Sequence, residues 1–194
     1  SSPSNIHIDT SFTNAAGACV PGGGDGGALV IGGSEDQGTI HASSTPIIEA
    51  WVRTQTDCGA NGRILKIGFF TDSNLTVSGE TVAYEGGSFF RSRDSSNATG
   101  CNWEAINYSR GKQTRTPTEY APCATNCILP SDAISSFQKL RTEMSSSTVR
   151  YFINDKQVAE MSTTTPQAGL KAGAIIATES GSAVSAHQIL DIAR

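Results

Sequence analysis

Acidic side chains are the first residues to consider for chemistry, because most glycosidases place two carboxylates on either side of one bond. On a single strand such acids must stand at alternate positions, since alternate side chains share a face. Glu80 and Glu85 lie near turn residues at an odd spacing, and Glu104 stands alone. The chain contains no Glu-x-Asp-x-x-Glu motif. We therefore predict that the protein is not an enzyme and has no catalytic residues.

Histidines and loop acids suggest little further chemistry. The three histidines (His7, His41 and His187) have no recognisable catalytic neighbours, and we interpret them as exposed or hydrogen-bonded imidazoles. Asp25, Glu35 and Asp36 lie in Gly-rich stretches and are the candidates for Ca²⁺, which prefers clustered loop oxygens. Solvated loop acids are the commoner explanation, so no cofactor is expected. The glycine run at 21–27 lacks the Gly-Lys-Ser/Thr sequence of a phosphate loop.

Aromatic side chains are the candidates for sugar binding, which combines a stacking ring with polar groups. Trp51 and Trp103 lie in predicted strands, where packing in the core is the more common role for tryptophan. Tyr120 lies in a Pro-rich stretch and is the aromatic residue that we expect to be most exposed. We place a possible ligand near 111–127. The candidate ligand-binding residues are Tyr120, Trp103, Tyr108 and Arg115.

The five cysteines all lie in or beside Gly-, Asn- or Pro-containing stretches, which indicates disulfides between loops and an extracellular setting. Zinc ligands would need paired C-x-x-C spacing, and the last two cysteines are one residue too far apart for it. The odd number leaves one thiol unpaired. A Cys19–Cys58 bond is favoured, with a second bond between two of the other three. The cysteines are Cys19, Cys58, Cys101, Cys123 and Cys127.

The elements that must position these groups are strands. In the most regular stretch, Val149, Tyr151 and Ile153 alternate with polar and aromatic residues, and Asn154-Asp155 then supplies a tight turn before the strand at 156–161. About a dozen such strands, with a helical turn only at 131–136, predict an all-β antiparallel sandwich. We expect one domain over 1–194, with a long irregular loop at about 111–136. The other predicted strands include 6–12, 39–42, 46–54, 63–70, 81–84, 88–91, 102–108, 137–144, 171–178 and 186–193.

Composition excludes two classes of partner. The net charge is −4 and there is no basic cluster, so nucleic acid is not expected to bind. No apolar run is long enough to span a membrane. The polar start, Ser1-Ser-Pro-Ser4, does not resemble a signal peptide, and we expect a mature or truncated chain.

The second half of the chain resembles a concanavalin A-like (lectin/glucanase) jelly-roll module of phage tail and other virion proteins. The resemblance rests on Pro46–Arg53, Arg63–Phe70, Glu85–Phe90, Trp103–Gly111, Phe137–Arg141, Val149–Asn154, Val158-Ala159 and Ile189–Ile192.

This resemblance implies a non-enzymatic module on a virion surface that binds a receptor or glycan, or decorates a capsid or tail. Implied partners are a capsid or tail protein and a cell-surface glycan, with assembly as a homo-oligomer or within a larger particle. Two alternatives stay open. One is a secreted carbohydrate-active enzyme of the same fold, either a glycosidase or a lyase. The other is a purely structural capsid-cement protein.

Overall fold

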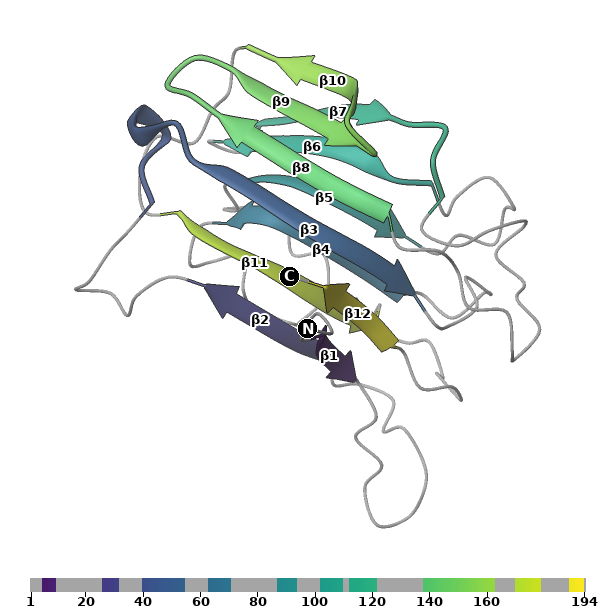
Figure 1. Cartoon of the computed structure of the whole chain (residues 1–194). Coiled ribbons are helices and arrows are strands. Elements are labelled where there is room, and N and C mark those ends of the chain that lie inside the picture. The colour runs from purple at the N-terminus through teal and green to yellow at the C-terminus, as the bar shows by residue number, and fades with distance from the viewer. Residues whose placement is uncertain are drawn as a thin grey trace, which may run out of the picture.

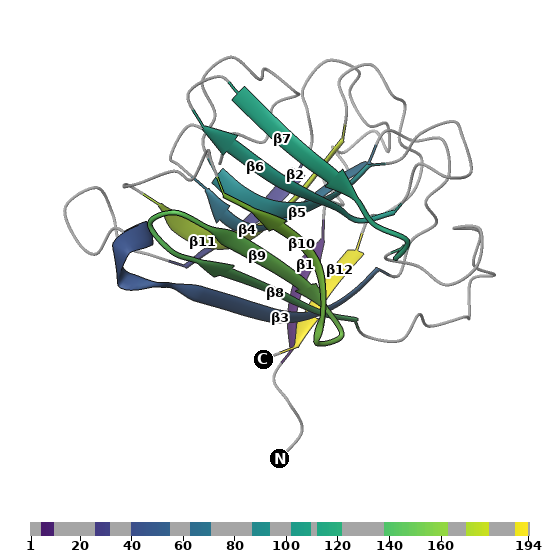
Figure 2. The same cartoon turned by 90° about the horizontal axis from the view of Figure 1, so that it is seen from above.

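A computed structural model of the chain describes residues 5–9, 26–31, 40–54, 63–70, 87–93, 102–109, 112–121, 138–162, 170–178 and 189–193. Within these residues the chain forms two antiparallel six-stranded sheets that stack face to face (Figures 1 and 2). The prediction of an all-β antiparallel sandwich of the jelly-roll type is confirmed. The helical structure within the described residues is one 3-10 turn, η1 (Ala42–Ser44).

The two sheets interleave along the sequence. Sheet A has the strand order β1-β12-β3-β8-β9-β10, and sheet B has the order β2-β11-β4-β5-β6-β7. The strands of sheet A are β1 (Asn5–Asp9), β12 (Ile189–Ala193), β3 (Ile47–Thr54), β8 (Gln138–Met144), β9 (Val149–Ile153) and β10 (Lys156–Met161). The strands of sheet B are β2 (Gly26–Ile31), β11 (Lys171–Thr178), β4 (Arg63–Phe70), β5 (Gly87–Arg93), β6 (Glu104–Ser109) and β7 (Lys112–Pro117).

The hairpin β9–β10 forms where the sequence predicts it. Asn154 and Asp155 take φ values of 50° and 65°, the left-handed conformation that a two-residue turn of this kind requires at both positions. The backbone N–H of Asn154 donates to the carbonyl of Lys139, and its side-chain oxygen accepts from the Lys139 N–H. These bonds tie the turn to β8 and fix the register of the three strands.

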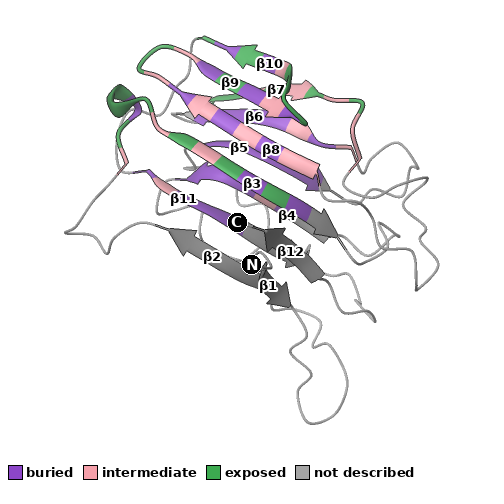
Figure 3. Cartoon of the chain, in the orientation of Figure 1, coloured by how far each residue is buried: buried purple, intermediate pink, exposed green. Residues whose placement is uncertain are grey.

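The core lies between the sheets and is built from the inward-facing residues of both. On β9 the buried residues are Val149, Tyr151 and Ile153, alternating with exposed or half-buried ones (Figure 3). Phe90 on β5 makes edge-to-face contacts with Tyr151 at 5.4 Å and with Trp103 at 6.3 Å. Burial of these rings stabilises the fold, by about 25 cal/mol for each Å² of apolar surface removed from water.

Three expectations about local structure are wrong. Residues 112–117 form strand β7, paired with β6, where the sequence predicted part of an irregular loop. The side chains of 112–117 do not alternate between apolar and polar, so no strand pattern is visible in the sequence. Pairing with β6 makes this segment a strand. Trp51 is 43% exposed on the outer face of sheet A, not packed in the core. Of the strand predicted at 39–42, the described residues 40–42 hold an isolated bridge between Ile40 and Leu170 and the start of η1 rather than a strand.

Several predictions fall outside the described residues. They concern all five cysteines, the acids proposed for Ca²⁺ (Asp25, Glu35 and Asp36), the predicted strand at 81–84 and the predicted helical turn at 131–136. Within the described part, no helix is long and apolar enough to cross a membrane.

Candidate functional site

The outer face of sheet B, which points away from sheet A, gathers the chemical groups of four strands. Register sets this face: Gly68 on β4 lies opposite Phe89 on β5, which lies opposite Ile106 on β6, which lies opposite Arg115 on β7. Because side chains alternate along each strand, residues two positions away share the face. The residues so placed are Lys66 and Phe70 on β4, Arg91 on β5, Glu104 and Tyr108 on β6, and Gln113 on β7.

Aromatic and aliphatic side chains form the floor of this face. Phe70, Phe89, Ile106 and Tyr108 make a second buried cluster, separate from the core between the sheets. The rings of Phe70 and Phe89 stack at 5.1 Å with an interplanar angle of 29°. The ammonium group of Lys66 lies 5.6 Å from the centre of the Phe89 ring. Sheet B therefore buries apolar groups on both of its faces.

Gly68 makes room for this floor. Its φ is 152°, and a Cβ built there would lie 2.5 Å from the Phe89 Cα and 2.5 Å from the Ser88 carbonyl oxygen. Glycine has no Cβ and adopts this φ readily, so β4 and β5 can approach closely here. The close approach places Phe89 where it stacks on Phe70.

One carboxylate and two guanidinium groups meet at the β5–β7 side of the floor. Arg91 donates to Glu104 Oε2 from Nε at 3.2 Å and from Nη2 at 2.9 Å. Arg115 Nη1 lies 3.5 Å from the other oxygen, Oε1. The side chain of Arg91 is 11% exposed and that of Glu104 is 21% exposed, whereas Arg115 is 57% exposed. The cluster therefore contains one nearly buried arginine, Arg91, and one solvent-exposed arginine, Arg115.

Cations outnumber acids on this face among the side chains that the structure describes. Lys171 on β11 lies opposite Phe70 and joins Lys66, Arg91 and Arg115, while Glu104 is the one acid of the set. Arginine forks bind carboxylates with two parallel hydrogen bonds, and a carboxylate on the same face can move a proton. The arrangement can thus hold an anionic ligand beside a proton-transfer group.

The structure separates the four residues predicted for ligand binding. It brings Tyr108 and Arg115 to the outer face of sheet B, where Tyr108 is buried in the floor and Arg115 is exposed. Trp103 is fully buried in the core, with its indole N–H donated to Gln138 at 2.8 Å. Tyr120 is half-buried beside that core, with the ammonium group of Lys156 5.7 Å from its ring centre.

The sequence analysis did not identify the residues that lie beside Arg115 in the cluster. Arg91 and Glu104 were not singled out as ligand-binding residues, although Phe89 and Arg91 alternate with core residues, as do Glu104, Ile106 and Tyr108. That alternation was the available signal for a second buried face of sheet B. No group of three or more His, Cys, Asp or Glu side chains suited to a metal occurs among the described residues.

Comparison with known proteins identifies the fold. No family model matches the chain, and no curated protein matches it. A GH16 protein of Bacteroides ovatus, solved with a mixed-linkage glucan product, superposes with a TM-score of 0.56 and 8% identity over 99% of this chain and 80% of that one.

Two further structures superpose about as well. The Bacillus licheniformis β-glucanase gives a TM-score of 0.51 at 8% identity, over 100% of this chain and 96% of that one. An alginate lyase of polysaccharide lyase family 7 gives 0.51 at 13% identity, over 86% of this chain and 65% of that one. The fold is therefore a concanavalin A-like jelly roll that carbohydrate-binding and carbohydrate-cleaving proteins use.

These comparisons contradict the prediction that the chain is not an enzyme, because the matched structures are glycosidases and lyases. The prediction rested on a search for acids at alternate positions of one strand. Arg91, Glu104 and Arg115 come from three strands and meet only through their register. The comparisons give no support to a virion or phage context.

Proposed function

We propose that the chain is a secreted polysaccharide lyase that cleaves an acidic polysaccharide on the outer face of sheet B. The observation that carries this proposal is the cluster of Arg91, Glu104 and Arg115 beside an aromatic floor. The likeness of the fold to an alginate lyase and to glucanases supports an enzyme acting on polysaccharide.

Arg115 is the group best placed to bind a carboxylate of the substrate. Its side chain is 57% exposed, and its contact with Glu104 Oε1, at 3.5 Å, is longer than a strong charge-assisted hydrogen bond. A guanidinium carries five N–H donors, so this contact leaves donors for a second carboxylate. Arg91, held at 2.9 Å to Oε2, keeps Glu104 in place while Arg115 turns to the substrate.

Elimination is the reaction that these groups suit. A base removes the proton α to the sugar carboxylate, the bond from the β carbon to the glycosidic oxygen breaks, and a carbon–carbon double bond forms. The departing oxygen takes a proton from water, and the base later releases its own proton to solvent. Positive charge at the substrate carboxylate stabilises the negative charge that develops during proton removal. Glu104 Oε1 is the base in this scheme, since both Arg91 contacts use Oε2.

The test compares two products. Purified protein is incubated with alginate, polygalacturonate and mixed-linkage β-glucan, and both new reducing ends and the ultraviolet absorbance of unsaturated uronate ends are followed. A lyase raises both signals in step on an acidic polysaccharide and neither on the neutral glucan. Failure to raise the ultraviolet signal on a broad panel of acidic polysaccharides would contradict the proposal.

A pair of exposed arginines supplies the matched control. Arg115→Ala removes the proposed carboxylate-binding group, and Arg150→Ala removes an arginine of similar exposure, 51%, that pairs with Glu160 at 3.0 Å on the opposite sheet. Arg115→Ala should raise KM about tenfold or more, because a charged hydrogen bond of this kind contributes about 1.5–3 kcal/mol. Arg150→Ala should leave KM unchanged.

A hydrolase is the second candidate, favoured by the TM-score of 0.56 to the GH16 protein and by Glu104 on the face. Hydrolysis pairs two carboxylates about 5–9.5 Å apart. Among the described side chains of this face, Glu104 is the one carboxylate. New reducing ends without ultraviolet absorbance would favour the hydrolase.

A further inference from the structure

We propose that the outer face of sheet A is a second, non-catalytic binding surface that takes a neutral polysaccharide chain, with Trp51 as its stacking platform. This surface lies on the opposite side of the sandwich from the outer face of sheet B, and the proposal does not depend on the reaction assigned there. The residues of the surface are Ile47, Glu49 and Trp51 on β3, Lys139, Arg141 and Glu143 on β8, and Arg150 and Phe152 on β9.

Two large apolar side chains stand exposed on this surface. Trp51 is 43% exposed and Ile47 is 62% exposed, and both lie on β3, the third strand of sheet A (Figures 1 and 3). They are four residues apart and on one face, a separation of about 13 Å along the strand. An exposed aromatic ring is a surface on which a sugar ring can stack, since the C–H face of the sugar is apolar and its hydroxyls point outward to polar neighbours.

The charges around Trp51 are satisfied within the surface. Lys139 bonds to Glu49 at 3.2 Å and to Asp155 at 2.9 Å, and its ammonium group lies 5.8 Å from the Trp51 ring centre. The Asp155 and Glu49 carboxylates raise the pKa of Lys139 through their hydrogen bonds. Lys139 is thus held over the Trp51 ring as a fixed donor, and a sugar ring would stack on the part of the side chain that stays exposed, 43%.

The same pairing continues across β8 and β9. Arg141 Nε lies 3.3 Å from Glu143, and the Arg141 guanidinium also lies 4.1 Å from the centre of the Phe152 ring. Arg150 donates to Glu160 at 3.0 Å. Positive and negative groups alternate over the surface, so its field is nearly balanced. A polyanion gains little here, whereas a hydroxyl-rich neutral chain finds donors and acceptors already held in place.

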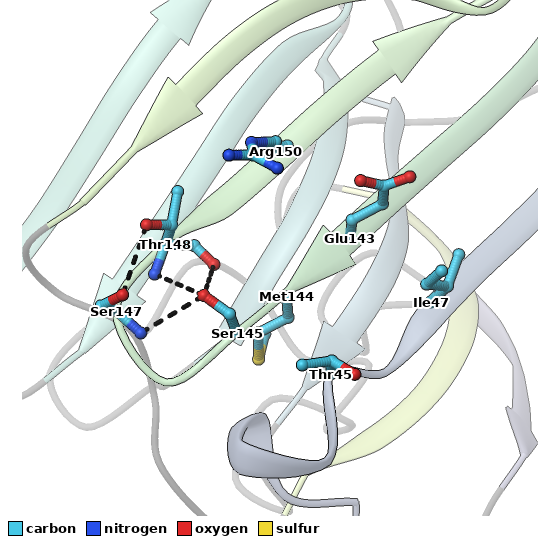
Figure 4. Close-up of a pocket in the computed structure, with 8 residues that line it drawn as sticks. All are labelled: Thr45, Ile47, Glu143, Met144, Ser145, Ser147, Thr148 and Arg150. Atoms are coloured by element: carbon cyan, nitrogen blue, oxygen red, sulfur yellow. Dashed lines mark hydrogen bonds between the residues drawn. The ribbon is translucent and has the colours of Figure 1, made fainter.

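The surface ends in a hollow beside the β8–β9 turn. Figure 4 shows Ile47, Glu143 and Arg150 on its strand side and Ser145, Ser147 and Thr148 on the turn side. The hollow has a volume of about 410 Å³. It lies at the Ile47 end of the surface, so one chain crossing Trp51 can run along β3 into it.

The two tryptophans give the test a direct readout. Trp51 is 43% exposed and Trp103 is fully buried, so iodide in solution quenches the fluorescence of Trp51 and not that of Trp103. Mixed-linkage β-glucan, xylan and galactomannan are the neutral probes, and alginate is the anionic one. We expect at least one neutral polysaccharide to protect Trp51 from iodide, and alginate to protect it less.

Affinity electrophoresis in gels that contain the same polysaccharides tests the assignment. Trp51→Ala should weaken retardation about tenfold, the loss expected for one aromatic stack, and Trp51→Tyr should retain most of it. Lys112→Ala, at an exposed position on the other sheet, should bind as the wild type does. Thermal unfolding of each variant separates loss of the surface from loss of the fold.

Three outcomes would overturn the proposal. The first is the absence of protection or retardation with all three neutral polysaccharides. The second is an equal loss of retardation in Trp51→Ala and Lys112→Ala. The third is protection of Trp51 that grows with protein concentration in the absence of polysaccharide, which would mean that a second copy of the chain covers the surface.

Discussion

The hydroxyl of Tyr151 on β9 donates a hydrogen bond of 2.6 Å to the backbone carbonyl of Ile106 on β6, across the space between the two sheets. Tyr151 is fully buried, and its ring also packs edge-to-face on Phe90. Ile106 belongs to the floor of the outer face of sheet B. One side chain of sheet A therefore supports, from behind, the strand that presents Glu104.

Removing this hydroxyl should weaken the fold slightly. Tyr151→Phe keeps the ring and its contact with Phe90 but deletes the donor to Ile106. We expect the free energy of unfolding to fall by about 1 kcal/mol, the usual net value of one buried hydrogen bond. Denaturant titration measures the change. A variant as stable as the wild type would show that the bond contributes nothing net.

The same residue predicts how stability changes in alkali. Burial raises the pKa of the Tyr151 phenol far above its ordinary value of about 10, and a hydrogen bond with Ser88 offsets only part of that rise. Below pH 10 the phenol is protonated in both states and its contribution is complete. Above that pH the unfolded chain releases the proton while the folded chain keeps it, so stability falls as pH rises.

The slope of the unfolding free energy with pH is set by the one proton that the unfolded chain releases from Tyr151. Stability should fall by about 1.4 kcal/mol per pH unit from Tyr151 alone. In Tyr151→Phe the slope above pH 10 should be shallower by that amount. Unfolding measured at several alkaline pH values for both proteins provides the check, and equal slopes would contradict it.

Gly68 should tolerate no side chain. In Gly68→Ala the new Cβ would meet the Phe89 Cα and the Ser88 carbonyl, both backbone atoms, at 2.5 Å, and the φ of 152° disfavours any L residue. We expect a loss of about 2–4 kcal/mol in the free energy of unfolding. Ala174→Gly, on the adjacent strand β11, also changes one methyl group and should cost about 1 kcal/mol. Equal costs for the two changes would contradict the predicted clash.

Glu104→Gln separates proton transfer from substrate binding. The amide keeps the shape of the carboxylate but is a far weaker base, so kcat on the acidic polysaccharide should fall about 100-fold or more while KM changes little. Arg115→Ala should instead act mainly on KM. Because the side chains of Arg91 and Glu104 are only 11% and 21% exposed, loss of the charged partner should also lower the free energy of unfolding, by about 1–3 kcal/mol. An unchanged kcat would remove Glu104 as the base.

Strand positions could be predicted from the sequence wherever side chains alternate. The hairpin at 149–161 and the strand at 63–70 appear where they were predicted, because their apolar period and turn residues agree with their packing. The sequence also showed that Trp51 shares a face with Ile47 and Glu49. Trp51 was nevertheless assigned to the core because tryptophan is usually buried. The buried residues are instead Ala50 and Val52, its neighbours along β3.

The candidate site could not be predicted because it depends on register. Arg91, Glu104 and Arg115 are separated by 13 and 11 residues in the chain and become neighbours only when β5, β6 and β7 pair in one alignment. A shift of one residue would turn Glu104 into the core and leave Arg91 without it. A single sequence carries no signal strong enough to choose that alignment, least of all for β7, which has no buried residue.

Strand β7 is an edge strand of sheet B, and its composition affects whether a second molecule can pair with that edge. An end strand offers unpaired backbone groups to which a further chain can add, the first step toward amyloid-like stacking. Here the end strand carries Lys112 and Arg115 and finishes at Pro117, which has no N–H to donate. Positive charges on two such strands repel each other, and the proline interrupts the hydrogen-bond ladder. Strand pairing between molecules is therefore disfavoured at the β7 edge.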